Sequence, residues 1–327
     1  MDSGSDGYRV GSMFAGIGGI CLGFKNAGCR MVWANEIDHN ACETYRLNLG
    51  SDYLVEGDIY SIDADDIPEM DILTAGFPCQ AFSIAGYRKG FADERGVLFF
   101  EVMRVIKAVK PRVVFLENVK NLATHDNGNT FRNIEQCLRD AGYTISSDIL
   151  NTAEYGNIPQ NRERIYIVGF KDPTDLHNFS FPEPIEPTIG VRDVISKGKQ
   201  DEAYYYREDH PYYPKLKEVM KSRDTVYQWR RVYVRENKSN ECPTLTANMG
   251  TGGHNVPLIL DDYGIRKLTP EECLRFQGFP EDYRFPEKMA NCHRYKQAGN
   301  SVSVPVIGRI ANNIISAMRA TDDASRL

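Results

Sequence analysis

The stretch Asp71-Ile72-Leu73-Thr74-Ala75-Gly76-Phe77-Pro78-Cys79 is a short apolar run that ends in glycine, proline and cysteine. An apolar run of this length, bounded by turn residues, is typical of a buried strand. A second such run, Arg112–Leu116, ends at Glu117. Side chains at the carboxyl ends of neighbouring parallel strands meet along one edge of a sheet. The pattern therefore predicts that the thiol of Cys79 and the carboxyl group of Glu117 lie at the same edge.

Short apolar runs alternate with helix-like stretches through the first 170 residues. We expect strands at residues 8–14, 30–34, 71–75, 112–116, 145–150 and 164–170, and helices at 20–26, 40–49, 98–109 and 129–141. Strands that alternate with helices indicate βαβ units. The sequence therefore predicts an α/β fold with a doubly wound, mostly parallel, Rossmann-like sheet, which binds ligands at the carboxyl ends of its strands.

The alternation stops near residues 181–187, where three prolines fall within six positions and indicate a linker. Residues 188–265 carry a tyrosine cluster and a glycine-rich segment, and we interpret them as part of a smaller domain with long loops. Near the end of the chain, apolar residues recur at helical spacing: Ile307, Ile310, Ile314 and Met318. If that helix packs back on the first domain, the second domain is an insertion. The expected division is a first domain at residues 1–185, a smaller inserted domain at residues 186–294, and a C-terminal segment at residues 295–327 that returns to the first domain.

Composition narrows the class of protein. The chain of 327 residues has a formal net charge of −6, and no apolar stretch approaches the length of a membrane span. Its N-terminal tail is polar and acidic, unlike a signal peptide. Eight cysteines without a CxxC pair argue against a zinc site and a disulfide framework, so we expect a reducing cytoplasm. Residues 215–238 hold eight basic and three acidic residues, either a polyanion-binding surface or an ordinary solvated face.

A glycine-rich turn, Phe14-Ala15-Gly16-Ile17-Gly18-Gly19, follows the first expected strand. Its spacing differs from the GxGxxG pattern of dinucleotide-binding proteins. Glu36 follows the second strand, where a carboxylate can accept both hydroxyls of a ribose, and Asp58 can accept from an adenine amino group. An adenosine without phosphates indicates S-adenosyl-L-methionine. Each acid taken alone is equally typical of a helix cap or a surface position.

Five motifs occur in the order that characterises one enzyme family: residues 14–19, Gly76-Phe77-Pro78-Cys79-Gln80, Glu117-Asn118-Val119, Gln160-Asn161-Arg162-Glu163-Arg164 and Gln297-Ala298-Gly299-Asn300-Ser301-Val302. In these motifs the chain resembles the cytosine-C5 DNA methyltransferases of the bacterial modification type, from about residue 8 to 315. The resemblance implies an S-adenosyl-L-methionine-dependent methyltransferase sheet with an inserted target-recognition domain. It further implies methyl transfer to carbon 5 of a cytosine flipped out of duplex DNA, with S-adenosyl-L-homocysteine as the other product and no metal.

The resemblance also implies catalytic roles. Cys79 is the expected nucleophile, whose thiolate adds to carbon 6 of cytosine and makes carbon 5 reactive toward the methyl group. Glu117, as a protonated acid near N3, stabilises the charge that develops on the ring. Arg164 matches the arginine that holds the flipped base and the catalytic loop, and Arg162 stands beside it.

The resemblance to the family's motifs also implies which residues bind the cofactor. They are Phe14, Ala15, Gly16, Gly18, Gly19, Glu36, Ile37, Asp58, Ile59, Pro78, Leu98, Asn300 and Val302. Two positions depart from the pattern of many members. Ser12-Met13 stands where an acid is common, and Ile37 replaces a tryptophan that stacks on adenine. Both departures are expected to affect affinity more than chemistry.

The region between the arginine motif and the final motifs reads DNA sequence in this family, and here it comprises residues 188–265. Pro243-Thr244-Leu245-Thr246-Ala247 resembles the Thr-Leu element near the end of such domains, and Trp229 offers a stacking ring. The short length of the region predicts one short recognition site. Residues 80–97 resemble the lid that closes on DNA. The expected DNA-binding residues are Gln80, Ser83, Arg95, Gln228, Arg230, Arg231, Thr244, Thr246 and Gly252.

Three other functions remain open at this stage. A tRNA cytosine methyltransferase keeps the same motifs, a non-catalytic relative keeps the binding surfaces, and a nicotinamide oxidoreductase shares only the glycine turn. The preferred interpretation is a monomeric enzyme of the bacterial cytoplasm or nucleoid that acts on double-stranded DNA. A cognate restriction endonuclease that acts separately is a possible partner, and no membrane is involved.

Overall fold

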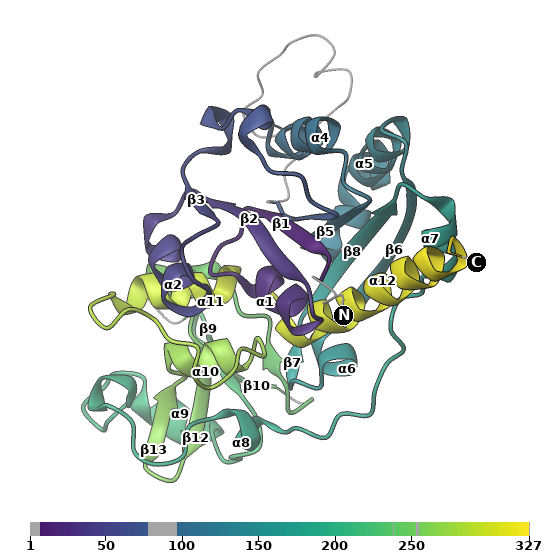
Figure 1. Cartoon of the computed structure of the whole chain (residues 1–327). Helices are drawn as coiled ribbons and strands as arrows, with labels where there is room; N and C mark the ends of the chain where they lie inside the picture. Colours follow the sequence, from purple (N-terminus) through teal and green to yellow (C-terminus); the bar gives the residue numbers. More distant parts are fainter. Residues whose placement is uncertain (1–6, 78–96, 238, 253–254, 327) are drawn as a thin grey trace, which may run out of the picture. The chain divides into compact units, whose positions relative to one another are not determined.

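The computed structural model describes residues 7–77, 97–237, 239–252 and 255–326, and Figure 1 traces the chain. Backbone contacts divide it into two units. Unit 1 comprises Met1–Leu150, Glu163–Glu183 and Val306–Leu327, and unit 2 comprises Asn151–Arg162 and Pro184–Pro305. Unit 2 thus takes in residues 151–162, 184–185 and 295–305, which the sequence-based division assigned to other parts. The functional roles expected of the domains remain predictions.

Unit 1 contains a seven-stranded sheet with the strand order β3-β2-β1-β4-β5-β8-β6. Strands β1 to β5 pair in parallel, and β8 pairs antiparallel with β5. The order reverses between β1 and β4, which is where ligands bind in open α/β sheets. The expected α/β fold with a mostly parallel sheet is confirmed. The strand bounds are β1 (Arg9–Met13), β2 (Arg30–Glu36), β3 (Leu54–Glu56), β4 (Ile72–Gly76), β5 (Val113–Val119), β6 (Thr144–Asn151) and β8 (Glu163–Phe170).

Strands β2 and β5 continue well past their expected ends because of pairing partners that periodicity does not show. Strand β2 reaches Glu36, which pairs with Glu56 of β3. Strand β5 reaches Val119, which pairs with Arg164 of β8. Both acidic residues of interest, Glu36 and Glu117, therefore lie on strands rather than in the loops that follow them.

Helices cover both faces of this sheet (Figure 1). On one face, Leu73 and Leu116 share a core with apolar residues of α4 and α5, among them Ile106 and Ile134. On the other face, the ring of Phe24 in α1 meets Phe115 of β5 edge-on, with centroids 5.3 Å apart. The helices of unit 1 are α1 (Gly19–Asn26), α2 (His39–Leu49), α4 (Val97–Val109), α5 (Asn129–Asp140), α7 (Pro173–Asn178) and the unit 1 part of α12 (Val304–Ala324).

The C-terminal helix α12 packs on α1 by close backbone approach. Its apolar stripe at Ile307, Ile310, Ile314 and Met318 is fully buried. A Cβ atom added at Gly23 of α1 would lie 2.4 Å from Cγ2 of Ile307, so only glycine leaves room for this helix. The end of α12 is held by an ion pair of 2.6 Å between Arg112 and Asp322.

Unit 2 is built around a four-stranded antiparallel sheet with the order β10-β9-β12-β13. Leu216, Tyr227, Trp229 and Ile265 belong to its apolar core. None of the helices in the described part of the chain has the length and apolar character that a membrane span requires. The elements of unit 2 are α6 (Thr152–Gly156), β7 (Gln160–Asn161), α8 (Val191–Val194), α9 (Tyr213–Val219), β9 (Tyr227–Arg230), β10 (Tyr233–Glu236), β11 (Cys242–Pro243), β12 (Leu258–Asp261), β13 (Gly264–Lys267), α10 (Pro270–Arg275) and α11 (Asn291–Asn300).

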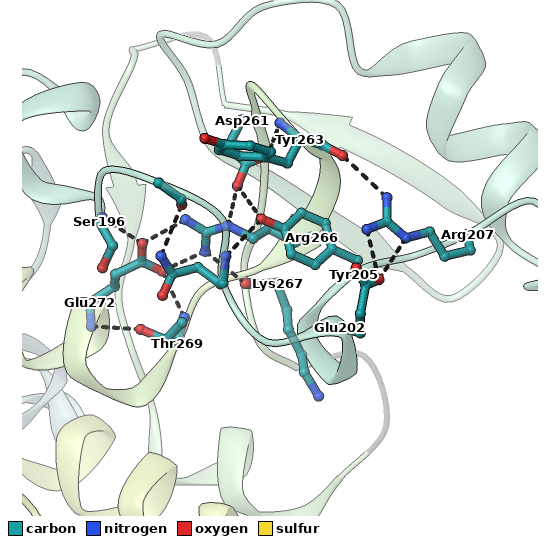
Figure 2. A network of polar contacts seen from close by, with 12 residues as sticks. Ser196, Glu202, Tyr205, Arg207, Asp261, Tyr263, Arg266, Lys267, Thr269 and Glu272 are labelled. Atoms are coloured by element: carbon teal, nitrogen blue, oxygen red, sulfur yellow. Dashed lines mark hydrogen bonds and ion pairs between the residues drawn. The ribbon is translucent and has the colours of Figure 1, made fainter.

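A buried ionic network ties the sheet of unit 2 to α10 (Figure 2). The guanidinium group of Arg266 is fully buried and contacts Asp261 at 2.6 Å and Glu272 at 2.7 Å. Glu272 also accepts from the backbone N–H groups of Ser196 and Thr269. Removing one member of such a network is costly because it leaves a buried charge without compensation. The network thus joins β12, β13, α10 and the loop at Ser196.

The α1–α12 contact predicts the effect of a single added methyl group. Gly23→Ala should lower the free energy of unfolding by about 1–3 kcal/mol, because the new Cβ would clash with Ile307. Gly308→Ala on the facing helix is the matched control, since its Cβ would find its nearest neighbour at an ordinary 3.6 Å. That control should be neutral or stabilise by up to about 1 kcal/mol. Urea denaturation measures both, and equal stabilities would contradict the close approach.

Candidate active site

The glycine-rich turn after β1 is held against the end of β2 by backbone hydrogen bonds. The N–H of Gly16 donates to Oε2 of Glu36 at 2.7 Å. The N–H of Ala15 donates to the carbonyl of Asn35 at 2.9 Å. Gly16 and Gly18 have φ angles of 55° and 86°, which glycine adopts without strain. A Cβ added at Gly16 would meet no described heavy atom within 4 Å, so the turn presents open backbone there.

The carboxylate of Glu36 is fixed by three backbone donors. Besides Gly16, its Oε1 accepts from the N–H of Ile37 at 2.9 Å and of Asp38 at 2.8 Å. A carboxylate offers about four acceptor positions, so capacity remains for a ligand hydroxyl. Ile37 beside it leaves 64% of its surface exposed, unusual for an aliphatic side chain. The end of β2 therefore presents an oriented acid next to an apolar surface.

Asp58 and Ile59 follow β3 and differ in exposure. Asp58 is exposed and accepts from the N–H of Tyr60 at 3.1 Å, so it caps a short 3₁₀ turn. Ile59 is 3% exposed and belongs to the core of unit 1. Buried Asn35 fixes the approach to Asp58, because its Nδ2 donates to the carbonyl of Gly57 at 2.9 Å. Asn35 was not expected from the sequence, where its one signal is its position just before Glu36.

The other expected cofactor residues fall in three groups. Phe14 and Leu98 are half-buried and pack against the core cluster that contains Ile59, while Ala15 and Gly19 are buried beside the turn. Asn300 and Val302 belong to unit 2, where Asn300 is exposed and Val302 is 7% exposed. Pro78 lies outside the described residues.

At the carboxyl edge of the sheet, Glu117 and Arg164 form an ion pair. Glu117 is 8% exposed, and Nε of Arg164 lies 3.2 Å from its Oε1. Gly76, at the end of β4, pairs with Glu117 in the sheet, and a Cβ added there would lie 3.6 Å from Oε2 of Glu117. The carboxyl group therefore lies beside the end of the strand that leads to Pro78 and Cys79.

Asn118 holds the end of that strand. Its Nδ2 donates to the carbonyl of Phe77 at 2.7 Å, and its Oδ1 accepts from the N–H of Val119 at 2.8 Å. The side chain is 3% exposed. Asn118 lies within the Glu117-Asn118-Val119 motif, but only the structure shows that its side chain anchors Phe77.

Five expected site residues lie outside the described residues: Pro78, Cys79, Gln80, Ser83 and Arg95. Most of the expected lid at residues 80–97 lies outside them as well. The described cysteines are mostly poor alternatives to Cys79 as nucleophile. Burial raises the pKa of Cys29 and Cys42 to about 12, and raises those of Cys21, Cys242 and Cys273 as well. A thiol with a raised pKa holds little thiolate near neutral pH.

Arg162 is arranged differently from Arg164. It is 3% exposed and belongs to unit 2. Its Nη1 donates to the carbonyl of Leu245 at 2.9 Å, and its Nη2 donates to the carbonyl of Ser301. Two nitrogens of the guanidinium group are thus engaged by backbone.

Most of the expected DNA-binding residues that the structure describes are exposed. Arg230 ends β9 and Arg231 begins the turn to β10, and both are exposed, as are Thr246 and Gly252. Gln228 is half-buried. Exposed Thr244 donates its hydroxyl to the carbonyl of Asn161 at 2.7 Å.

The expectation that Trp229 offers its ring to a base is wrong. The ring is 9% exposed and stacks on Tyr212, with centroids 4.1 Å apart, so it serves the core of unit 2. Its Nε1 donates to the carbonyl of Arg231 at 2.9 Å and thereby holds the turn. Val232 and Tyr233 were not expected from the sequence, and they are 70% and 58% exposed beside the arginines.

The chain is similar to known proteins over most of its length. The model of the C-5 cytosine-specific DNA methylase family matches residues 8–316. The chain is 57% identical to type II methyltransferase M.Bsp6I of Bacillus sp. (strain RFL6) over 95% of this chain and 99% of that protein. It is 42% identical to type II methyltransferase M.HaeII of Haemophilus aegyptius, covering 95% of this chain and 94% of that protein.

Solved structures share the fold. The S. pombe Dnmt2 methyltransferase superposes with a TM-score of 0.73 at 22% identity, covering 95% of this chain and 99% of that one. A prophage-encoded putative DNA modification methyltransferase from E. coli superposes with a TM-score of 0.67 at 23% identity, covering 97% and 99%.

The chain therefore belongs to the C-5 cytosine-specific DNA methylase family. It is a DNA (cytosine-5-)-methyltransferase, and the methyl donor of this family is S-adenosyl-L-methionine. The resemblance found in the five motifs is confirmed.

The fixed carboxylate of Glu36 predicts a large loss of cofactor affinity when it becomes an amide. In Glu36→Gln, the new NH₂ group would face backbone N–H donors, so S-adenosyl-L-homocysteine should bind about tenfold more weakly or worse, a cost of about 1.4 kcal/mol. Isothermal titration measures the affinity. Glu69→Gln is the control, because that side chain is 91% exposed before the start of β4 and should bind normally. Unchanged affinity in Glu36→Gln would show that Glu36 does not contribute to cofactor binding.

Proposed function

We propose that this enzyme methylates carbon 5 of a cytosine that is flipped out of one short, specific site in duplex DNA. The observation that carries the proposal is the Glu117–Arg164 ion pair beside the end of β4. In the sequence, Pro78 and Cys79 follow Gly76, the last residue of β4, by two and three positions. An acid, a guanidinium group and a thiol nucleophile form the set that cytosine activation requires.

Cys79 is the proposed nucleophile. Its thiolate forms a bond to carbon 6 of the cytosine, and the ring electrons move to carbon 5. When bound, S-adenosyl-L-methionine supplies an electrophilic methyl group, which carbon 5 accepts. Loss of the proton from carbon 5 and departure of the thiolate from carbon 6 then restore the aromatic base and the free enzyme.

Glu117 is the proposed proton or hydrogen-bond donor near N3 of the flipped base. Negative charge develops on the ring as the thiolate adds, and a nearby donor stabilises it. Arg164 is the proposed group that holds the base, and its contact with Oε1 orients the carboxyl group. Glu117 is buried and the Arg164 side chain is only 13% exposed, which favours these roles because electrostatic interactions are stronger where the local dielectric constant is low.

The turn after β1 fits an adenosine-containing cofactor. Open backbone at Gly16, the oriented Glu36 and the exposed Ile37 offer surfaces for a ribose and an adenine. We assign the ribose hydroxyls to Glu36, the adenine edge to Asp58 and an apolar contact to Ile37. The remaining proposed contacts come from Phe14, Ala15, Gly18, Gly19, Ile59, Pro78, Leu98, Asn300 and Val302.

DNA recognition is proposed for exposed residues of unit 2. Arg230 and Arg231 suit phosphate or base-edge contacts, and the apolar Val232 and Tyr233 beside them suit base contacts in a groove. Gln228, Thr244, Thr246 and Gly252 are further proposed DNA contacts of unit 2. Gln80, Ser83 and Arg95, which lie outside the described residues, are proposed as DNA contacts from the sequence alone. The type II naming of the relatives supports a role in restriction and modification. We further propose a monomeric enzyme whose cognate endonuclease acts separately.

A trapping experiment tests substrate and nucleophile together. The enzyme, incubated with labelled S-adenosyl-L-methionine and duplex DNA containing 5-fluorocytosine, should form a covalent adduct that survives a denaturing gel. Fluorine cannot leave carbon 5 as a proton does, so the thiolate stays bound. Cys79→Ser should form no adduct, whereas Cys292→Ser, which removes an exposed cysteine of α11, should form it normally.

The alternatives give different outcomes in the same experiment. An adduct with fluorinated tRNA alone would assign the enzyme to RNA. An adduct that persists in Cys79→Ser would refute the nucleophile. No adduct on either nucleic acid, with S-adenosyl-L-homocysteine still bound, would favour a non-catalytic relative.

We expect Arg230 and Arg231 to contribute to the salt dependence of DNA binding. Each phosphate contact contributes about 0.9 to the slope of log affinity against log salt concentration. Replacing both arginines with alanine should weaken binding and flatten that slope by up to about 2, as measured by fluorescence anisotropy across salt concentrations. Arg132→Ala with Arg139→Ala on α5 is the control and should leave the slope unchanged. An unaltered slope in the variant that lacks Arg230 and Arg231 would show that neither arginine contacts a DNA phosphate.

A further inference from the structure

Arg162 joins three segments of unit 2 that are far apart in the sequence. It follows β7, and its guanidinium group donates to the carbonyls of Leu245 and Ser301. Leu245 is 1% and Ser301 is 8% exposed, so these bonds form away from water. The N–H of Arg162 also donates to Oδ1 of Asn151 at 3.0 Å, which fixes the arginine on its own segment. A buried donor group with two carbonyl partners holds both at a set distance.

The two segments that Arg162 binds also contact each other directly. A Cβ added at Gly299 of α11 would lie 2.1 Å from the carbonyl carbon of Thr246. A Cβ added at Gly250 would lie 2.3 Å from the carbonyl oxygen of Cys292. Glycine at both positions lets α11 rest on the 3₁₀ turn Ala247–Thr251 without a side chain between them. Neither segment can shift without moving the other or breaking this packing.

Two glutamines extend the same connection. Oε1 of Gln160 accepts from the N–H of Leu245 at 3.2 Å, and its Nε2 donates to Oε1 of Gln277 at 3.2 Å. Nε2 of Gln277 donates in turn to the carbonyl of Ala298 at 3.0 Å. Both glutamine side chains are fully buried. Side-chain hydrogen bonds therefore connect Leu245 with α11 by a second route.

The joined segments carry residues with different proposed partners. Leu245 lies between Thr244 and Thr246, both proposed to contact DNA. Ser301 lies between Asn300 and Val302, both proposed to contact the cofactor. We propose that Arg162 is a positioning residue that couples DNA binding to cofactor binding through these two carbonyls. This inference rests on the proposed function, and it replaces the catalytic role expected for Arg162 from the sequence.

The coupling is measured as a ratio of affinities. In the wild type, S-adenosyl-L-homocysteine should bind several-fold more tightly to the enzyme with DNA than without it, within the roughly 5–150-fold range of typical couplings. The DNA probe is a duplex carrying the site that bisulfite sequencing identifies in plasmid methylated by this enzyme. Linkage requires that S-adenosyl-L-homocysteine tighten DNA binding by the same factor, which checks the measurement internally.

Arg162→Lys keeps the charge but cannot donate to both carbonyls in the guanidinium geometry. The affinity ratio should fall toward one in this variant. Arg275→Lys is the matched control: Arg275 also makes two hydrogen bonds within unit 2, to the carbonyl of Val194 and to Oγ of Ser196, both at 2.7 Å. It should lose comparable stability in thermal unfolding and keep the wild-type ratio, which separates coupling from a general loss of structure.

A measurement on the wild type covers the case in which Arg162→Lys does not fold. In hydrogen exchange, DNA should change protection in residues 297–304, and S-adenosyl-L-homocysteine should change protection in residues 242–251. Changes confined to each ligand's own segment, an unaltered ratio in Arg162→Lys, or a wild-type ratio of one would each overturn the coupling. If the wild type methylates no DNA, the proposed function fails and the coupling fails with it, whereas a methylating enzyme without coupling loses this inference alone.

Discussion

The antiparallel pairing of β8 with β5 is the constraint on which the proposed catalytic edge depends. Arg164 lies near the start of its strand, whereas Glu117 lies near the end of its own. In a parallel pair these positions would fall at opposite edges of the sheet. Because β8 runs the other way, Arg164 pairs with Val119 and its Nε reaches Glu117. One reversed strand therefore places the guanidinium group where β4 and β5 end.

Backbone bonds made by buried or half-buried polar side chains give that edge its shape. Glu36 receives three N–H donors and fixes the glycine turn, while Asn118 holds the carbonyl of Phe77 before the expected nucleophile. Such bonds carry little net free energy, about 1 kcal/mol each, but an unmade bond at a buried group costs more. They therefore act by excluding other conformations of the turn and of the strand end. The same principle applies to Arg162 in unit 2, whose two carbonyl partners belong to distant segments.

Much of unit 1 was predictable because its signals are local. Apolar runs and helical spacing located β1, β4 and α5, and motif order identified the family. The errors and omissions concern side chains whose roles depend on distant partners. Trp229 has a ring of the kind that stacks on bases, yet Tyr212 covers that ring. Arg162 and Arg164 belong to one motif, and no local pattern distinguishes the arginine that contacts Glu117 from the one that binds two carbonyls.

The sequence by itself determined the enzyme family, the α/β class, the cofactor type and the chemical groups from which a catalytic site can be built, because motif order and periodicity are properties of the chain. The tertiary structure alone decided which of those groups meet. Strand direction brought Arg164 to Glu117, and close packing at Gly23 and Gly299 set helices against their neighbours. The physical reason is that hydrogen bonds and packing contacts join residues across long sequence separations, where local periodicity carries no information.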